Sequence, residues 1–265
     1  NYGWPICYNQ KIHEIGEAQG TSAALQFAKA TIIKNRPYAV IHFVMHIIGR
    51  DAYYNTRDIQ KGLAHLPPDA LEPENFLNYD GYKHGLFQAF FYENRNVEDN
   101  LALYQKACPT LELSAPKLDT ASYLDPVSYE ENPVENCFHG IGHALMYAKG
   151  NDVLKVVAQC EELPRANMRY WCYIGAFMEN SYLHSNFLYD EHAPRPFVKE
   201  DAMVSLCRSF GDEEKTSLCS QYVGRAYWIM YYPDVQGALK QCHLVTPEYI
   251  NRCMRQVIIY PLAGF

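Results

Sequence analysis

The chain has 265 residues, of which 48% are hydrophobic and 20% are charged. This length allows a large buried core, and this composition excludes a disordered chain. The net charge is −7 and no basic cluster offsets it, which argues against a nucleic-acid partner. The longest apolar run, residues 38–48, contains two histidines and is too short to cross a bilayer, so we expect no transmembrane segment.

Apolar residues recur with helical spacing along almost the whole chain, and no strand pattern interrupts them. In the first helical run, Thr21 or Ser22 is a candidate N-cap. Residues 109–133 are rich in proline and polar residues, and we expect them to form a long surface loop. The predicted helices are residues 21–34, 38–55, 58–66, 80–94, 98–108, 134–149, 152–163, 169–183, 199–210, 215–232, 234–243 and 247–262.

These helices pair into hairpins, and short similar segments in different parts of the sequence indicate duplication. Gly49-Arg50-Asp51-Ala52-Tyr53 resembles Gly224-Arg225-Ala226-Tyr227, and Phe91-Tyr92-Glu93-Asn94 resembles Phe177-Met178-Glu179-Asn180. Stacked helical hairpins are typical of repeat proteins, in which neighbouring units bury a continuous core. We therefore predict an all-α fold of α-hairpin repeats that form an α-solenoid or α/α toroid, as one domain over residues 1–265. The approximate hairpins are residues 21–56, 57–97, 98–150, 151–190, 199–232 and 233–265.

Nine cysteines are present, and the last six fall into three pairs that flank hairpin loops. Eleven, eleven and ten residues lie between the partners of Cys160/Cys172, Cys207/Cys219 and Cys242/Cys253. Each disulfide would join two consecutive helices and stabilise the fold by roughly 3 kcal/mol. Cys108 and Cys137 are a candidate fourth pair, which leaves Cys7 odd. Such disulfides predict a secreted or periplasmic protein, and reduced cysteines in a cytosolic protein are the alternative.

Six glycines lie inside the second helices of the predicted hairpins. A glycine inside a helix costs roughly 1 kcal/mol relative to alanine. Close approach of two helices explains this cost, and a ligand that needs access to the backbone is the less favoured explanation. The six are Gly49, Gly85, Gly140, Gly142, Gly175 and Gly224.

Two histidine pairs have the spacing His-x-x-x-His, namely His42/His46 and His139/His143. On a helix, both members of such a pair lie on one face, one turn apart, so their ring nitrogens can converge on one ion. Both pairs fall in second helices of predicted hairpins, which suggests equivalent repeat positions. Neutral imidazole binds transition metals, and we predict zinc first, with iron or copper as alternatives. Histidines that merely pack and hydrogen-bond in the core are the competing interpretation.

Four further residues complete the candidate site. His84 is a candidate cofactor-binding residue that completes or supports the metal site. Glu179 is the candidate catalytic residue, as a general base beside a metal-bound water. Arg50 and Arg225 each follow a glycine and are candidates for binding an anionic cofactor, with ion pairs to neighbouring carboxylates as the alternative.

The functional prediction is a secreted or periplasmic helical-repeat protein with a histidine-lined concave site for a transition metal. The residues are compatible with a metal-dependent hydrolase and with an oxidoreductase, and they do not decide whether the protein is an enzyme. The alternative is a protein-interaction or structural subunit without catalysis. In that case the 22 tyrosines would line a concave face that holds a protein partner.

Overall fold

The computed structural model describes residues 4–33, 38–68, 73–97, 100–108, 133–182 and 200–262. The regular parts of these ranges are helical and contain no strand, which confirms the all-α prediction. The predicted loop at 109–133 lies outside the described residues, except for Pro133, with which α7 begins. The helices are α1 (Trp4–Gln19), α2 (Thr21–Ala28), α3 (Tyr38–Thr56), α4 (Ile59–Leu63), α5 (Pro73–Glu93), α6 (Asn100–Ala107), α7 (Pro133–Ala148), α8 (Val153–Cys160), α9 (Ala166–Tyr182), α10 (Glu200–Ser209), α11 (Glu213–Tyr231), α12 (Val235–Gln241) and α13 (Ile250–Leu262).

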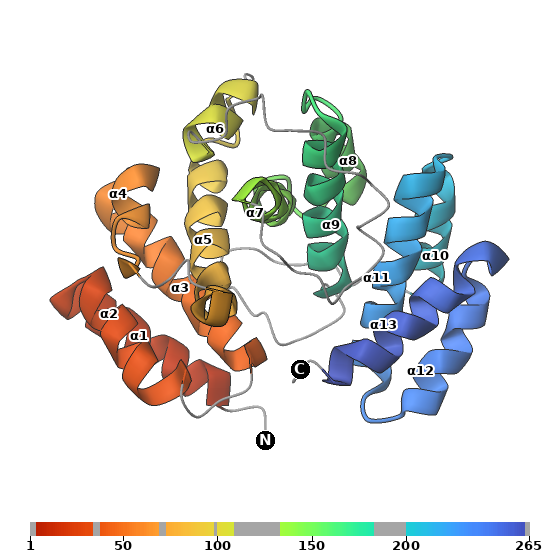
Figure 1. Ribbon diagram of the computed structural model, residues 1–265, viewed down its shortest axis with the longest axis horizontal. Coiled ribbons are helices and arrows are strands. Elements are labelled where there is room, and N and C mark those ends of the chain that lie inside the picture. Colours follow the sequence, from red (N-terminus) through yellow and green to blue (C-terminus); the bar gives the residue numbers. More distant parts are fainter. Residues whose placement is uncertain are drawn as a thin grey trace.

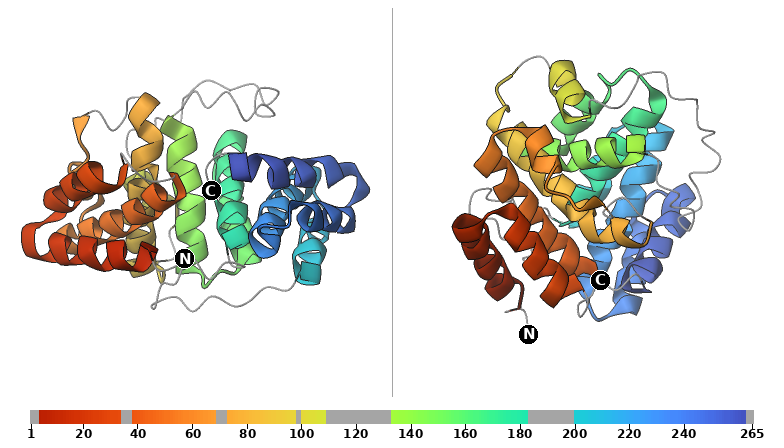
Figure 2. Two further views of the ribbon diagram at one scale, coloured as in Figure 1. Left: turned by 90° about the horizontal axis from the view of Figure 1, so that it is seen from below. Right: turned by 60° about the vertical axis from the view of Figure 1, so that its left-hand side comes forward.

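Long and short helices alternate from α3 onward. The long helices α3, α5, α7, α9, α11 and α13 have 13 to 21 residues, and the short helices between them have 5 to 10. Each long helix packs against the next one along the chain. Figure 1 shows this order, with α1 and α13 on opposite sides and α7 between α5 and α9, and the turned view in Figure 2 agrees.

Aspartates at the starts of several helices explain where these helices begin. Asp58, Asp152, Asp212 and Asp234 each accept hydrogen bonds from backbone amides in the first turn of the helix that follows. The predicted N-cap of the first helical run is wrong, because Thr21 is already the first residue of α2 and Gly20 precedes it. Gly20 has a φ of 87°, and it separates α2 from α1, a helix that the sequence pattern did not predict.

Each of the last four long helices, α7, α9, α11 and α13, is joined by one disulfide to the segment before it. All three predicted hairpin pairs are present, and so is the candidate pair Cys108–Cys137, with Cα–Cα distances between 5.4 and 6.1 Å. Disulfides persist in oxidising compartments, so the chain fits an extracytoplasmic protein. Among the described helices, none combines the length and the apolar character that crossing a bilayer requires.

The helical glycines lie where two long helices touch through their backbones. A Cβ atom at Gly49, Gly142 or Gly224 would overlap the carbonyl oxygen of Tyr82, Cys172 or Cys253, respectively, on the next long helix. The contact therefore recurs in the pairs α3–α5, α7–α9 and α11–α13. The first two pairs also have a contact in the opposite direction. Gly85 on α5 faces the carbonyl of His46 on α3, and Gly175 on α9 faces the carbonyl of His139 on α7. This confirms the close-approach interpretation at these positions.

Most of the tyrosines whose side chains the structure describes belong to the core. Eight of them are buried, and they pack between helices rather than on an open face. Tyr82, for example, is fully buried on α5, and its hydroxyl donates a hydrogen bond to the carbonyl oxygen of Gly62. The eight are Tyr53, Tyr79, Tyr82, Tyr104, Tyr147, Tyr173, Tyr222 and Tyr227.

Candidate metal centre

Five histidines from three consecutive long helices converge in the middle of the molecule. His42 and His46 come from α3, His84 from α5, and His139 and His143 from α7. The ring of His84 is central, because its centroid lies 5.2 and 5.4 Å from the rings of the α3 pair and 5.2 and 4.7 Å from those of the α7 pair. The predicted ligands thus meet, and His84 joins them.

Within each pair the two histidines face each other through the same ring nitrogen. The Nε2 atoms of His42 and His46 are 3.1 Å apart, and those of His139 and His143 are 3.0 Å apart. Two ligand nitrogens of one tetrahedral ion are separated by a similar distance, since each Zn–N bond is about 2.0–2.1 Å long. The one-turn spacing of the sequence therefore produces pairs whose geometry suits a shared ion.

The other ring nitrogen of one member of each pair has a side-chain acceptor. His46 Nδ1 lies 3.2 Å from Gln88 Oε1, and His143 Nδ1 lies 2.8 Å from Glu179 Oε2. A carboxylate only accepts hydrogen bonds, so the proton of neutral His143 is on Nδ1 and the lone pair of Nε2 points toward His139. Such a partner behind a histidine is the usual support of a metal ligand.

The centre is well shielded from solvent. His42, His84 and His143 are 7%, 0% and 1% exposed, while His46 and His139 are partly exposed. Burial and the neighbouring imidazoles of His42 and His84 hold the pKa of His46 well below its usual value. At neutral pH His46 is therefore neutral, which is the form that binds a metal.

The glycine contacts fix which histidines occupy matching positions. His46 precedes Gly49 by three residues, and His139 precedes Gly142 by three residues. These glycines make the same contact in the two helix pairs, so His46 matches His139. The two His-x-x-x-His pairs are consequently offset by one helical turn and are not equivalent, contrary to the sequence-based expectation.

Two contacting residues, Gln88 and Met178, were not predicted. Gln88 follows Gly85 by three residues, and Met178 follows Gly175 by three residues, so they match in the same register. They also contact the matching histidines, since Met178 Sδ lies 3.3 Å from His139 Nε2. The three-residue spacing from a glycine is the sequence signal that marks Gln88 and Met178. This spacing becomes informative only when the contact of each glycine is known.

The glycine at position 140 has a different role from the others. A Cβ atom there would meet the side chains of Phe87 and His84, both on α5, rather than a backbone carbonyl. Its small size thus makes room on α7 for the central imidazole. The sequence predicted close approach at Gly140 but did not identify His84 as the neighbour.

Arg50 on α3 and Arg225 on α11 occupy the positions that correspond to His143 on α7. Arg50 follows Gly49 on α3 and Arg225 follows Gly224 on α11, as His143 follows Gly142. Arg225 is 2% exposed, and α11 supplies none of the five histidines. Binding of an anionic cofactor by these arginines stays a prediction.

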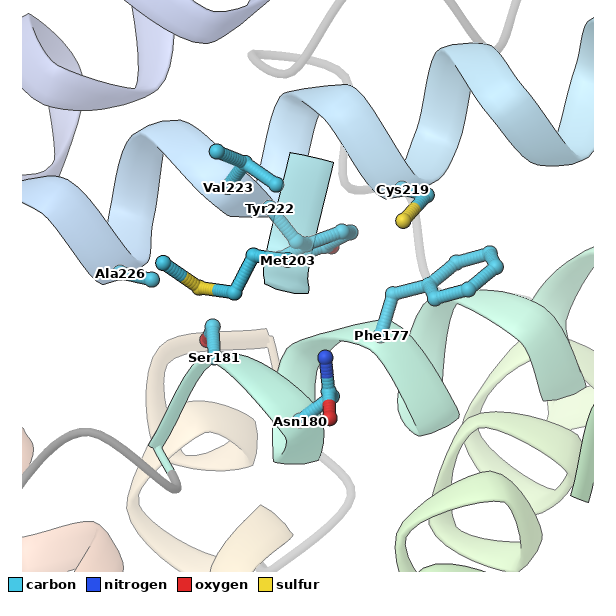
Figure 3. A pocket seen from close by; sticks show the side chains of 8 residues that line it. All are labelled: Phe177, Asn180, Ser181, Met203, Cys219, Tyr222, Val223 and Ala226. Atoms are coloured by element: carbon cyan, nitrogen blue, oxygen red, sulfur yellow. The ribbon is translucent and has the colours of Figure 1, made fainter. Parts of the chain in front are cut away.

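A separate hollow lies between α9, α10 and α11 (Figure 3). It encloses about 200 Å³, its open mouth included, and none of the five histidines borders it. Apolar side chains such as Phe177 and Met203 supply most of its wall. The hollow is therefore distinct from the histidine centre. Its lining residues are Phe177, Asn180, Ser181, Met203, Cys219, Tyr222, Val223 and Ala226.

The donor atoms form two groups that each suit a metal ion. One group consists of His42, His46 and His84, and the other of His84, His139 and His143, with all donor atoms of a group within 4.8 Å of one another. Fold and site together define an all-helical, disulfide-bonded protein with a buried histidine cluster able to hold a metal ion. No family model matches the chain, and comparisons with curated proteins and with solved structures find no match.

Proposed function

We propose that the chain is a secreted or periplasmic helical-repeat protein whose five-histidine centre binds a transition metal. The observation that carries this proposal is the pair of Nε2–Nε2 contacts, 3.1 Å on α3 and 3.0 Å on α7. In each pair, one Nδ1 atom is engaged by an acceptor, so an unprotonated Nε2 faces the centre.

The contact between Glu179 and His143 also supports a cation in the centre. Glu179 is 2% exposed and hydrogen-bonds to His143, which is 1% exposed. A carboxylate behind a histidine orients the ring and makes it a better ligand for an ion. We therefore expect an ion at His143 Nε2.

Zinc is the metal that we expect first, because imidazole and carboxylate-supported imidazole are its usual ligands. The thioether of Met178 beside His139 adds a soft donor, which makes copper the second expectation. Such an ion, when bound, supplies Lewis-acid activation of water or electron transfer. Glu179 holds His143 in its ligating orientation.

The helical repeat and the location belong to the same proposal. The glycine–carbonyl contact recurs in three successive pairs of long helices, which indicates a unit of two hairpins present three times. Four disulfides support secretion or a periplasmic location. The alternative of a tyrosine-lined face for a protein partner has weaker support, because eight tyrosines are buried in the core.

The test is a competition titration with Zn²⁺ and a chromophoric chelator, using the wild type and His139→Ala/His143→Ala. We expect tight binding by the wild type and a loss of at least about 100-fold in affinity in the double variant, because both ligands on α7 are removed. Replacing the exposed residues His13 and His243 by alanine is the matched control, and it should leave the affinity unchanged.

Glu179→Gln provides a second variant that preserves the side-chain volume. It should weaken zinc binding by about 10- to 100-fold, since the carboxylate behind His143 is lost. Circular dichroism shows whether each variant is folded. A wild type that binds no metal, or a folded double variant that binds zinc as tightly as the wild type, would refute the proposal.

A further inference from the structure

His84 is shared between the two groups of donor atoms. It is fully buried, and both of its ring nitrogens are shielded from solvent. The rings of His42 and His46 lie 5.2 and 5.4 Å from its ring between centroids, and those of His139 and His143 lie 5.2 and 4.7 Å from it. Gly140 leaves the space in which this ring stands.

The α3 and α7 pairs are too far apart to bind one ion together. Donor atoms within 4.8 Å of one another form two groups of three, and only His84 belongs to both. The rings of His46 and His143, which approach each other across the centre, are 6.5 Å apart between centroids. A single ion can therefore use one pair and His84, but the second pair would remain without an ion.

On the basis of the proposed function, we propose that the centre holds two metal ions that are bridged by the imidazolate of His84. One ion binds to His42, His46 and one ring nitrogen of His84, and the other binds to His139, His143 and the opposite ring nitrogen. Neutral imidazole carries one N–H proton, so the second ion displaces that proton to solvent and takes the freed lone pair. No oxidation or reduction is involved in this step.

The two positions differ in the charge behind their ligands. Glu179 supports the α7 pair through His143, whereas the neutral amide of Gln88 supports the α3 pair through His46. An anionic partner raises the basicity of its histidine and balances the charge of the ion. The first ion therefore occupies the α7 position, and the α3 position fills second.

A titration with Cu²⁺, followed by electron paramagnetic resonance with spin quantitation, tests the bridge. Each isolated Cu²⁺ ion has one unpaired electron, and an imidazolate bridge couples two such electrons antiferromagnetically. In the wild type we expect the signal to rise during the first equivalent and to fall during the second. In His84→Gln the signal should continue to rise with every ion bound, because an amide side chain does not transmit this coupling.

The outcomes separate this inference from the proposed function. A wild-type signal that rises through two equivalents, or binding that stops at one ion, would overturn the bridge while the metal centre itself stands. Absence of copper and zinc binding would overturn both. The wild-type titration alone decides the question, so a His84→Gln variant that fails to fold does not weaken the test.

Discussion

Replacing Gly175 by alanine is expected to destabilise the protein by about 2 kcal/mol or more. The new Cβ atom would overlap the carbonyl oxygen of His139 on α7, and a backbone atom cannot move aside as a flexible side chain does. The steric cost exceeds the gain of about 1 kcal/mol that alanine brings inside a helix. Because α9 must move away from α7, binding of Zn²⁺ should weaken as well. Urea unfolding and the zinc titration measure the two effects.

Gly16 provides the matched control for this prediction, because it also lies inside a helix. A Cβ atom at Gly16 would have its nearest neighbours at 3.8 and 4.0 Å, which is ordinary van der Waals contact. Gly16→Ala should therefore leave the stability unchanged or raise it by up to about 1 kcal/mol. Equal behaviour of the two variants would show that α7 and α9 do not touch through their backbones as described.

Removal of the Cys160–Cys172 disulfide is expected to lower the free energy of unfolding by about 2–5 kcal/mol. This disulfide joins α8 to α9 across a sequence separation of 12 residues, and both sulfurs are buried. The backbone of Cys172 also lies against Gly142, next to His143, a proposed ligand. Cys160→Ala/Cys172→Ala should therefore lose zinc affinity together with stability, as measured by urea unfolding and by competition titration.

The Cys242–Cys253 disulfide serves as the control for the effect on zinc. It closes a loop of similar length, with a separation of 11 residues, and it joins the segment after α12 to α13. These helices supply none of the five histidines, so Cys242→Ala/Cys253→Ala should lose similar stability but retain its zinc affinity. If both variants lost zinc to the same extent, the effect would come from general destabilisation rather than from the position of α9.

The helices and disulfides could be predicted because their signals are local. Apolar spacing and prolines located most of the helices, and the short intervals between cysteines identified three pairs. Helix α1 was missed, since its apolar stripe is weak and polar residues occur all along it. Its boundary with α2 depends on the positive φ of Gly20, which a single glycine in a sequence does not specify.

The sequence predicted which histidines meet in the candidate site, but not how they are arranged. The one-turn spacing identified His42/His46 and His139/His143 within single helices. The central place of His84 depends on how α5 packs between α3 and α7, which is a long-range property. For the same reason, the contact between Gln88 and His46, the contact between Met178 and His139, and the one-turn offset of the pairs followed only from the structure.

The measurement that tests the account most directly is anomalous diffraction from crystals grown with zinc, with data collected on both sides of the zinc absorption edge. We expect an anomalous peak within about 2.0–2.1 Å of the Nε2 atoms of His139 and His143. Zinc found only at exposed residues such as His13 or His243, with no peak among the five central histidines, would contradict it.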